Sequence, residues 1–259
     1  MDSSIEQISK DALVVSTMVS LAKAGDFLQT VEWNLDGLKR SGAERFVQSF
    51  GGGGQLKSRN ARSILKSHLK RFEIDMSQML RFSVVVAVYT LFESRVRSFI
   101  DDFNRTCPGK PNFDKFEKTN GHNGFVLIFR RWLEEKPNSV TIKYPRIWSR
   151  LDDFRHIRNC IAHANGELSL VKDKNKQKLK DAIRRSRNVR FEGSTLALET
   201  KYPFQVLERV DVFFQLLFSE AGYRIDCPPG YSKAMSKHFA GFEKEMMERM
   251  ADYYREKTL

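Results

Sequence analysis

The sequence predicts a mostly α-helical fold that carries one small β-hairpin. Apolar residues recur every three or four positions through much of the 259-residue chain, which is the spacing of a buried helix face. Apolar and polar residues alternate in the stretch NVRFEGSTLALE, around Glu192-Gly193-Ser194, which suits two short strands and a turn. Runs rich in glycine, proline and asparagine separate the helical segments.

The first segment, residues 4–40, has the apolar spacing of a helix. The run Gly51–Gly54 follows it, and because glycine holds a helix poorly, this run marks a flexible loop or linker. We therefore expect an N-terminal helical arm at 1–50 and a glycine-rich linker at 51–59.

The middle of the chain predicts a helix at 60–80 and a second, stronger one at 81–104. A loop rich in Pro, Gly and Asn is expected at 105–123, before a further helix at 124–135. The apolar positions of the second helix repeat every three or four residues: Val85, Val88, Phe92, Val96, Phe99 and Phe103.

The second half of the chain begins with a predicted helix at 146–164, which should stop at Asn165-Gly166. The basic run at 172–190 has the composition of a mobile, solvated loop. A helix should open at Pro203 and end near Ala221. A last amphipathic helix is expected at 232–256.

Composition and charge favour a cytoplasmic protein with a polyanionic partner. The formal net charge is +12, and such a surplus weakly supports nucleic acid. Three sparse cysteines argue against a disulfide framework or a zinc site. The acidic, polar N-terminus does not resemble a secretory signal, and the most apolar stretch, Val84–Phe92, is too short to span a bilayer. We expect no membrane association, no metal and no cofactor.

One motif carries chemistry. Residues 154–166 read FRHIRNCIAHANG and contain Arg158-Asn159-x-x-x-His163. The bare spacing also occurs at Arg62…His68 and Arg150…His156. Context separates the third occurrence, because an Asn follows its Arg and the helix stops directly after its His.

This motif resembles the signature of the HEPN superfamily of ribonuclease-like helical domains. Glu93 and Arg97 on the preceding helix match a Glu-x-x-x-Arg pattern found in some HEPN families. The resemblance covers roughly 60–222. It implies a HEPN-like helical bundle with a small β-hairpin insertion. The helical N-terminal arm and a helical C-terminal extension at 223–259 lie outside the resemblance. The resemblance also implies a homodimer whose cleft both copies share.

A projection at 100° per residue tests the motif helix. Leu151, Phe154, Ile157 and Ile161 fall on one side and should face the core. The polar residues Asp152, Arg155, Asn159 and His163 fall on the other side, with His156 beside them. Arg158 lies near the edge of the apolar stripe, about 140° from His163. In one copy, Arg158 and His163 therefore point in different directions. Two copies related by a two-fold axis would bring these side chains closer together.

The candidate catalytic residues suit metal-free RNA cleavage. Histidine transfers protons near neutral pH, so His163 is the proton-transfer candidate. Arg158 offers a planar fork of donors to a phosphate, and Asn159 could orient the imidazole or hold the phosphate. Glu93 and Arg97 could set the charge state of the site or simply form a surface pair. The resemblance implies products with a 2′,3′-cyclic phosphate and a 5′-hydroxyl.

RNA is the expected partner, and seven basic residues are the candidates to contact it: Arg155, Lys174, Lys176, Lys178, Lys180, Arg184 and Arg185.

Two functions stay open at this point. The first is a metal-independent endoribonuclease; such domains occur in toxin–antitoxin pairs, phage defence and RNA processing, which implies an antitoxin or regulatory partner protein. The second is a non-catalytic HEPN-like module that dimerises and binds RNA or protein.

Overall fold

The computed structural model describes residues 3–49, 59–107, 109–120 and 124–223, all within one compact unit, Met1–Tyr223. This unit is mostly helical, as predicted, with one two-stranded sheet. The expected glycine-rich linker and the expected helix at 232–256 lie outside the described residues.

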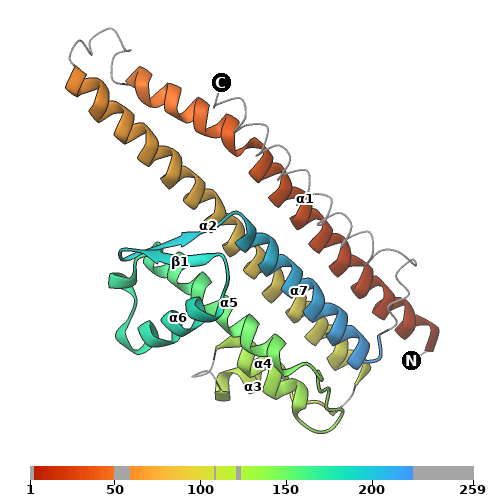
Figure 1. Cartoon of the computed structure of the whole chain (residues 1–259). Coiled ribbons are helices and arrows are strands. Elements are labelled where there is room, and N and C mark those ends of the chain that lie inside the picture. The colour runs from red at the N-terminus through yellow and green to blue at the C-terminus, as the bar shows by residue number, and fades with distance from the viewer. Residues whose placement is uncertain (1–2, 50–58, 108, 121–123, 224–259) are drawn as a thin grey trace. The chain divides into compact units, whose positions relative to one another are not determined.

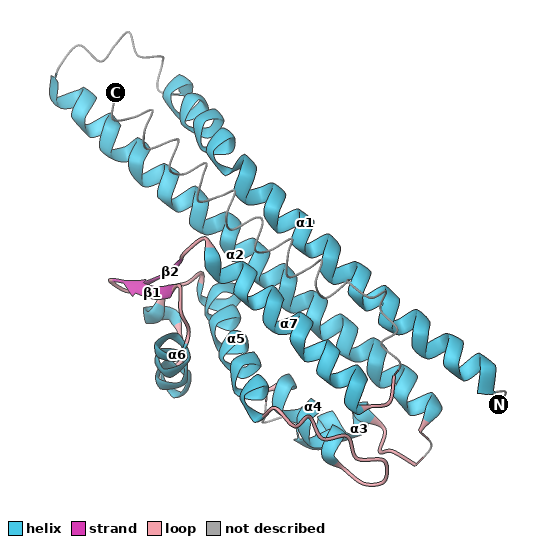
Figure 2. Cartoon of the chain, turned by 45° about the vertical axis from the view of Figure 1, so that its right-hand side comes forward, coloured by secondary structure: helices cyan, strands magenta, loops and turns pink. Residues whose placement is uncertain are grey.

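Two long helices form the frame of the unit. Helix α1 (Ser3–Ser49) lies alongside α2 (Arg59–Thr106), and α7 (Lys201–Glu220) packs against both (Figure 1). Helix α5 (Pro145–Ala164) contacts α2 and α7 on the side away from α1 (Figure 2). The predicted helix carrying the motif is thus confirmed, and it packs directly on α2.

Shorter elements flank α5. Helices α3 (Phe113–Asn120) and α4 (Phe125–Glu134) pack together, and α4 contacts α5. Helix α6 (Asp173–Arg185) packs along α5. Strands β1 (Val189–Glu192) and β2 (Thr195–Leu198) pair antiparallel, with Val189 opposite Leu198 and Glu192 opposite Thr195. The predicted hairpin is confirmed around Gly193.

Aromatic side chains from α2, α4 and α7 fill the core. Phe92 meets Phe213 with ring centroids 5.5 Å apart, and Phe99 meets Phe218 at 6.2 Å. All four rings are buried. The apolar faces at 81–104 and 204–221 offer enough area for a core and for an interface with a second copy, and these four rings pack inside one chain.

One predicted boundary is wrong. The helices expected at 60–80 and 81–104 are one continuous helix, α2, because no glycine or proline interrupts the chain there. The apolar pattern changes because the neighbours change. Near Ile74 and Met79 the side chains are exposed, whereas Val84 and Val85 are buried.

Two helices lie where loops were expected. Helix α3 forms inside the expected loop at 105–123, and α6 forms inside the basic run at 172–190. The apolar pattern did not predict α6 because few of its residues are apolar. Its buried residues are Leu179 and Ala182. Lysine and arginine are good helix formers, so that small apolar contact completes the helix.

The end of α5 follows its sequence signal. Asn165 has φ 48° and Gly166 has φ 78°, both left-handed, and the Gly166 amide donates to the Cys160 carbonyl at 3.1 Å. A Cβ on Gly166 would lie 2.9 Å from the Phe82 ring of α2. Glycine therefore both ends the helix and lets its end approach α2.

A half-buried ion pair joins α1 to the rest of the unit. Arg81 of α2 pairs with Glu32 of α1 at 3.0 Å, and it also donates to the Thr200 hydroxyl at 2.7 Å, just before α7. One guanidinium thereby ties α1, α2 and the start of α7 together.

The stretch Lys66–Thr106 is long and apolar enough, by composition, to cross a membrane. Its buried residues Val88, Phe92 and Val96 belong to the core formed with α5 and α7, however. The fold is therefore compatible with a soluble protein.

Candidate active site on helices α2 and α5

Arg158 lies against α2, where three side chains hold it. Its guanidinium carbon is 4.5 Å from the centroid of the Tyr89 ring. One terminal nitrogen lies 3.6 Å from the Glu93 carboxylate, and the other donates to the Asn159 Oδ1 at 3.0 Å. The arginine is therefore fixed by an aromatic face, a carboxylate and an amide.

The residues around Arg158 are partly or fully shielded from water. Tyr89 is 1% exposed, and burial and the neighbouring Glu93 raise the pKa of its hydroxyl, which hydrogen-bonds Glu93. Burial also raises the pKa of Glu93, although Arg158 and Arg97 act to lower it. Charge interactions here are stronger than they would be in open water.

Arg158 keeps donor capacity to spare. Its Nε is buried and has no hydrogen-bond partner among the described residues. A guanidinium presents five N–H donors, and one oxygen of Asn159 and a 3.6 Å carboxylate do not satisfy all of them. A phosphate that approached Arg158 would find a preoriented cation.

His163 is exposed at the end of α5, and within the described residues no hydrogen bond or ion pair holds it. It lies four residues after Asn159, on the same side of the helix. No hydrogen bond joins the two in this part of the chain. The imidazole is free to meet a substrate or a second protein chain.

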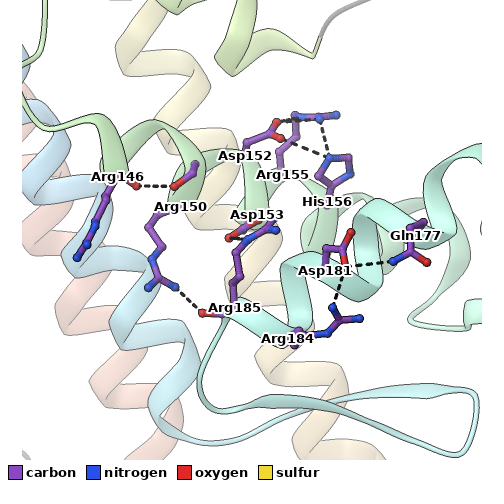
Figure 3. A network of polar contacts seen from close by, with 11 residues as sticks. Arg146, Arg150, Asp152, Asp153, Arg155, His156, Gln177, Asp181, Arg184 and Arg185 are labelled. Carbon is purple, nitrogen blue, oxygen red and sulfur yellow. Dashed lines mark hydrogen bonds and ion pairs between the residues drawn. The ribbon is translucent and has the colours of Figure 1, made fainter.

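The polar face of α5 also carries a cluster of three side chains. Arg155 donates through Nε to Asp152 at 2.9 Å, and its Nη2 lies 3.0 Å from the His156 Nε2 (Figure 3). The Arg155 guanidinium lies against Gly124, where a Cβ would come within 2.5 Å of it. Burial acts to raise the pKa of Asp152, but its contacts with His156 and Arg155 outweigh that effect and leave the pKa below its ordinary value.

This cluster changes two expectations. His156 was placed beside the exposed face of α5, yet it is 9% exposed, because the buried arc of the helix reaches round to that position. Arg155, expected to bind RNA, is already engaged by Asp152 and His156. The predicted core residues Leu151, Phe154, Ile157 and Ile161 are buried as expected.

Arg97 does not pair closely with Glu93. It forms ion pairs with Glu117 at 3.2 Å and with Asp114 at 4.0 Å, both on α3, and it lies 5.2 Å from the centroid of the Phe125 ring. It still lowers the pKa of Glu93 through its charge. Arg97 thus connects α2 to α3 and α4 and stands outside the immediate surroundings of Arg158.

The basic residues of α6 divide into two groups. Three are in ion pairs, since Lys176 pairs with Asp173, Arg184 with Asp181 and Arg185 with Asp153. The others are exposed and form no ion pair within the described part of the chain: Lys174, Lys178 and Lys180. The second group is the better placed to contact RNA.

Sequence reasoning missed Tyr89. It lies in the apolar stripe of α2, so it is indistinguishable from an ordinary core aromatic in the sequence. The one available signal is its position four residues before Glu93, which places both on one helix face.

Comparison with protein-family models, curated proteins and solved structures finds no match for this chain. Among the described residues, no group of three His, Cys, Asp or Glu side chains is placed to hold a metal ion.

Proposed function

We propose that this protein is a metal-independent endoribonuclease of the HEPN type. The observation that carries the proposal is the arrangement of α5 on α2: Arg158 is held on the Tyr89 ring beside Glu93 and Asn159, while His163 is exposed on the polar side of the same helix. A fixed guanidinium and a free imidazole are the two side chains that metal-free cleavage of RNA requires.

The reaction uses the RNA's own 2′-hydroxyl as nucleophile. A histidine removes the 2′-proton, the 2′-oxygen attacks phosphorus, and the bond to the 5′-oxygen breaks as that oxygen gains a proton. The products are a 2′,3′-cyclic phosphate and a 5′-hydroxyl. Arg158 binds the non-bridging oxygens and stabilises the charge that develops on them.

One copy of the chain supplies one exposed motif histidine, but the reaction needs a base and an acid. We therefore propose that the active unit is a dimer in which two α5 helices meet and share a cleft. A two-fold contact places two Arg158 and two His163 in that cleft without further residues. RNA is the proposed partner, and an antitoxin or regulatory protein would act by covering this surface.

The second candidate is a non-catalytic HEPN-like module that binds RNA or protein. The ion pair between Arg158 and Glu93 favours it, because a guanidinium already paired is less available to a substrate. The exposed apolar residues of α1, Val15, Phe27 and Trp33, also favour a protein-binding role.

Incubation of the purified protein with RNA in EDTA distinguishes the endoribonuclease from the non-catalytic module. We expect cleavage by the wild type, cyclic-phosphate ends on the products, and loss of cleavage in H163A. His68 is exposed on α2 and fits the bare Arg…His spacing, so H68A is the matched control and should cleave normally. RNA binding without cleavage by the wild type would support the module instead.

A further inference from the structure

A second cluster of arginines lies on a different side of α5 from His163. Arg146 and Arg150 are one turn apart on α5, Arg185 ends α6, and Arg209 lies on α7, which packs against α5 (Figure 3 shows the first three). The Arg150 side chain donates to the backbone carbonyl of Arg185. The end of α6 is thereby held against α5.

The one carboxylate buried in this cluster is already neutralised. Asp153 is 1% exposed and accepts two hydrogen bonds from Arg185, at 3.1 Å and 2.5 Å. A bidentate pair of this kind satisfies both charges. Among the described residues, neither Arg150 nor Arg209 forms an ion pair within 4 Å, although the charges of Asp153 and Glu208 act on Arg209 from farther away.

Two donors in the cluster are buried and have no acceptor. The Nη1 of Arg209 and the hydroxyl of Tyr202, both on α7, lack any hydrogen-bond partner in the described part of the chain. Tyr202 is 0% exposed. Burial lowers the pKa of Arg209 most and the like charge of Arg150 also lowers it, whereas Tyr202, Asp153 and Glu208 act to raise it, so Tyr202 and Arg150 both act on this guanidinium.

Buried donors without acceptors are costly, and the repulsion between neighbouring guanidinium groups adds to that cost, so one ligand relieves both. An oxyanion accepts several hydrogen bonds and adds negative charge beside Arg150 and Arg209. Gln205 lies between Tyr202 and Arg209 on the same face of α7, and its Oε1 is likewise buried without a partner. Rotation of its amide would place N–H donors where the unpartnered oxygen now lies.

We propose that Arg150, Tyr202 and Arg209 form a phosphate-binding site between α5 and α7, separate from the candidate active site. The ligand is a phosphate group, either free phosphate or a phosphate of the RNA backbone. In the second case this site holds a stretch of RNA beyond the one at Arg158, and the exposed cation Arg146 extends the path of the backbone across α5.

Thermal unfolding in phosphate and in chloride, at equal ionic strength and pH, tests the site. Phosphate stabilises most proteins by exclusion from their surface, so the informative quantity is the difference between variants. We expect phosphate to raise the Tm of the wild type by about 3 °C more than that of Y202F and R150Q. The matched control is R131Q, which removes an exposed charge from α4 and should behave as the wild type.

Y202F keeps the ring that fills the core, and Arg150 is only half-buried, so both variants should fold. Equal phosphate shifts in the wild type, Y202F and R150Q would overturn the proposal. A second measurement separates the two sources of phosphate: the affinity for a single-stranded RNA with and without phosphate at fixed ionic strength. Competition in the wild type but not in R150Q identifies the RNA backbone, whereas a Tm shift without competition identifies free phosphate.

Discussion

The guanidinium of Arg158 lies over the Tyr89 ring with its carbon 4.5 Å from the ring centroid, and the Tyr89 hydroxyl hydrogen-bonds the Glu93 carboxylate that faces the same arginine. One buried aromatic residue therefore positions both the cation and the anion of the candidate site. A ring face attracts a guanidinium by about 0.5–2 kcal/mol, depending on how far the pair is shielded from water.

The first prediction separates the ring of Tyr89 from its hydroxyl. Y89L should lower RNA cleavage by about ten-fold, because Arg158 loses the surface that orients it. Y89F keeps the ring and should retain most of the activity. Cleavage rates at saturating RNA, with circular dichroism as a check of folding, measure the effect.

A second variant that also removes a buried ring shows whether the loss of activity comes from looser packing. Phe154 packs edge-on against Tyr89, at 5.1 Å between centroids, and is similarly buried. Among the described residues Arg158 lies over the Tyr89 ring and over no other, so F154L removes a neighbouring ring without removing that contact. If F154L lost as much activity as Y89L at equal stability, the loss would come from looser packing, and Tyr89 would have no positioning role.

The second prediction concerns pH. Because burial raises the pKa of Glu93 in the folded state above its ordinary value of 4.5, the folded protein binds more protons than the unfolded chain in the window above pH 4.5. Stability should therefore fall as pH rises through that window. E93Q carries no charge to bury, so it should lose this part of the pH dependence.

Urea unfolding of the wild type and E93Q between pH 4.5 and 7 measures the difference. The free energy of unfolding of E93Q relative to the wild type should increase with pH. E134Q, which removes an exposed carboxylate paired with Arg130, tests whether any lost surface charge has the same effect. Parallel curves for the wild type and E93Q would mean that burial of Glu93 is unimportant.

The third prediction uses the division among the basic residues of α6. Changing Lys174, Lys178 and Lys180 together to Gln should weaken RNA binding and flatten its dependence on salt, because each phosphate contact releases counterions. Lys176 is held by Asp173 at 2.8 Å, so K176Q is the control and should bind nearly as the wild type does. Fluorescence anisotropy over a range of salt concentrations gives both quantities. An unchanged slope in the triple variant would exclude α6 from the RNA path.

The sequence was most informative where local rules decide the structure. The stop at Asn165-Gly166, the hairpin at Gly193 and the inward face of α5 follow from backbone preference and periodicity. It was least informative where tertiary contacts decide. The basic run became α6 through the burial of Leu179 and Ala182 against neighbours distant in sequence.

In the candidate site, too, the sequence predicted the features that depend on one helix and missed those that depend on contacts between helices. The motif placed Arg158, Asn159 and His163 on α5 correctly, and the projection separated Arg158 from His163. Neither could reveal that Arg158 rests on Tyr89, or that Arg97 pairs with Glu117 and Asp114 on α3. Those contacts depend on how α2 packs against α5 and α3, which no spacing within one helix encodes.

The last prediction is that the two catalytic side chains act across a dimer. Arg158 faces α2 while His163 is exposed, so one chain does not direct both at one phosphate. The polar side of α5 carries the exposed His163, so we expect that side to meet a second copy. A solution mass near twice 30.1 kDa is expected by light scattering.

Mixing inactive variants then tests whether the cleft is shared. R158A and H163A homodimers should each lack cleavage, but a heterodimer of the two retains one intact Arg158 and one intact His163 in the common cleft. Co-expression of differently tagged chains and isolation of the mixed dimer should recover weak activity, because one Arg158 and one His163 again face the same phosphate while water replaces the second histidine. A monomer that cleaves RNA at the same protein concentration would rule out the shared cleft, because each chain would then supply its own acid, base and phosphate contact.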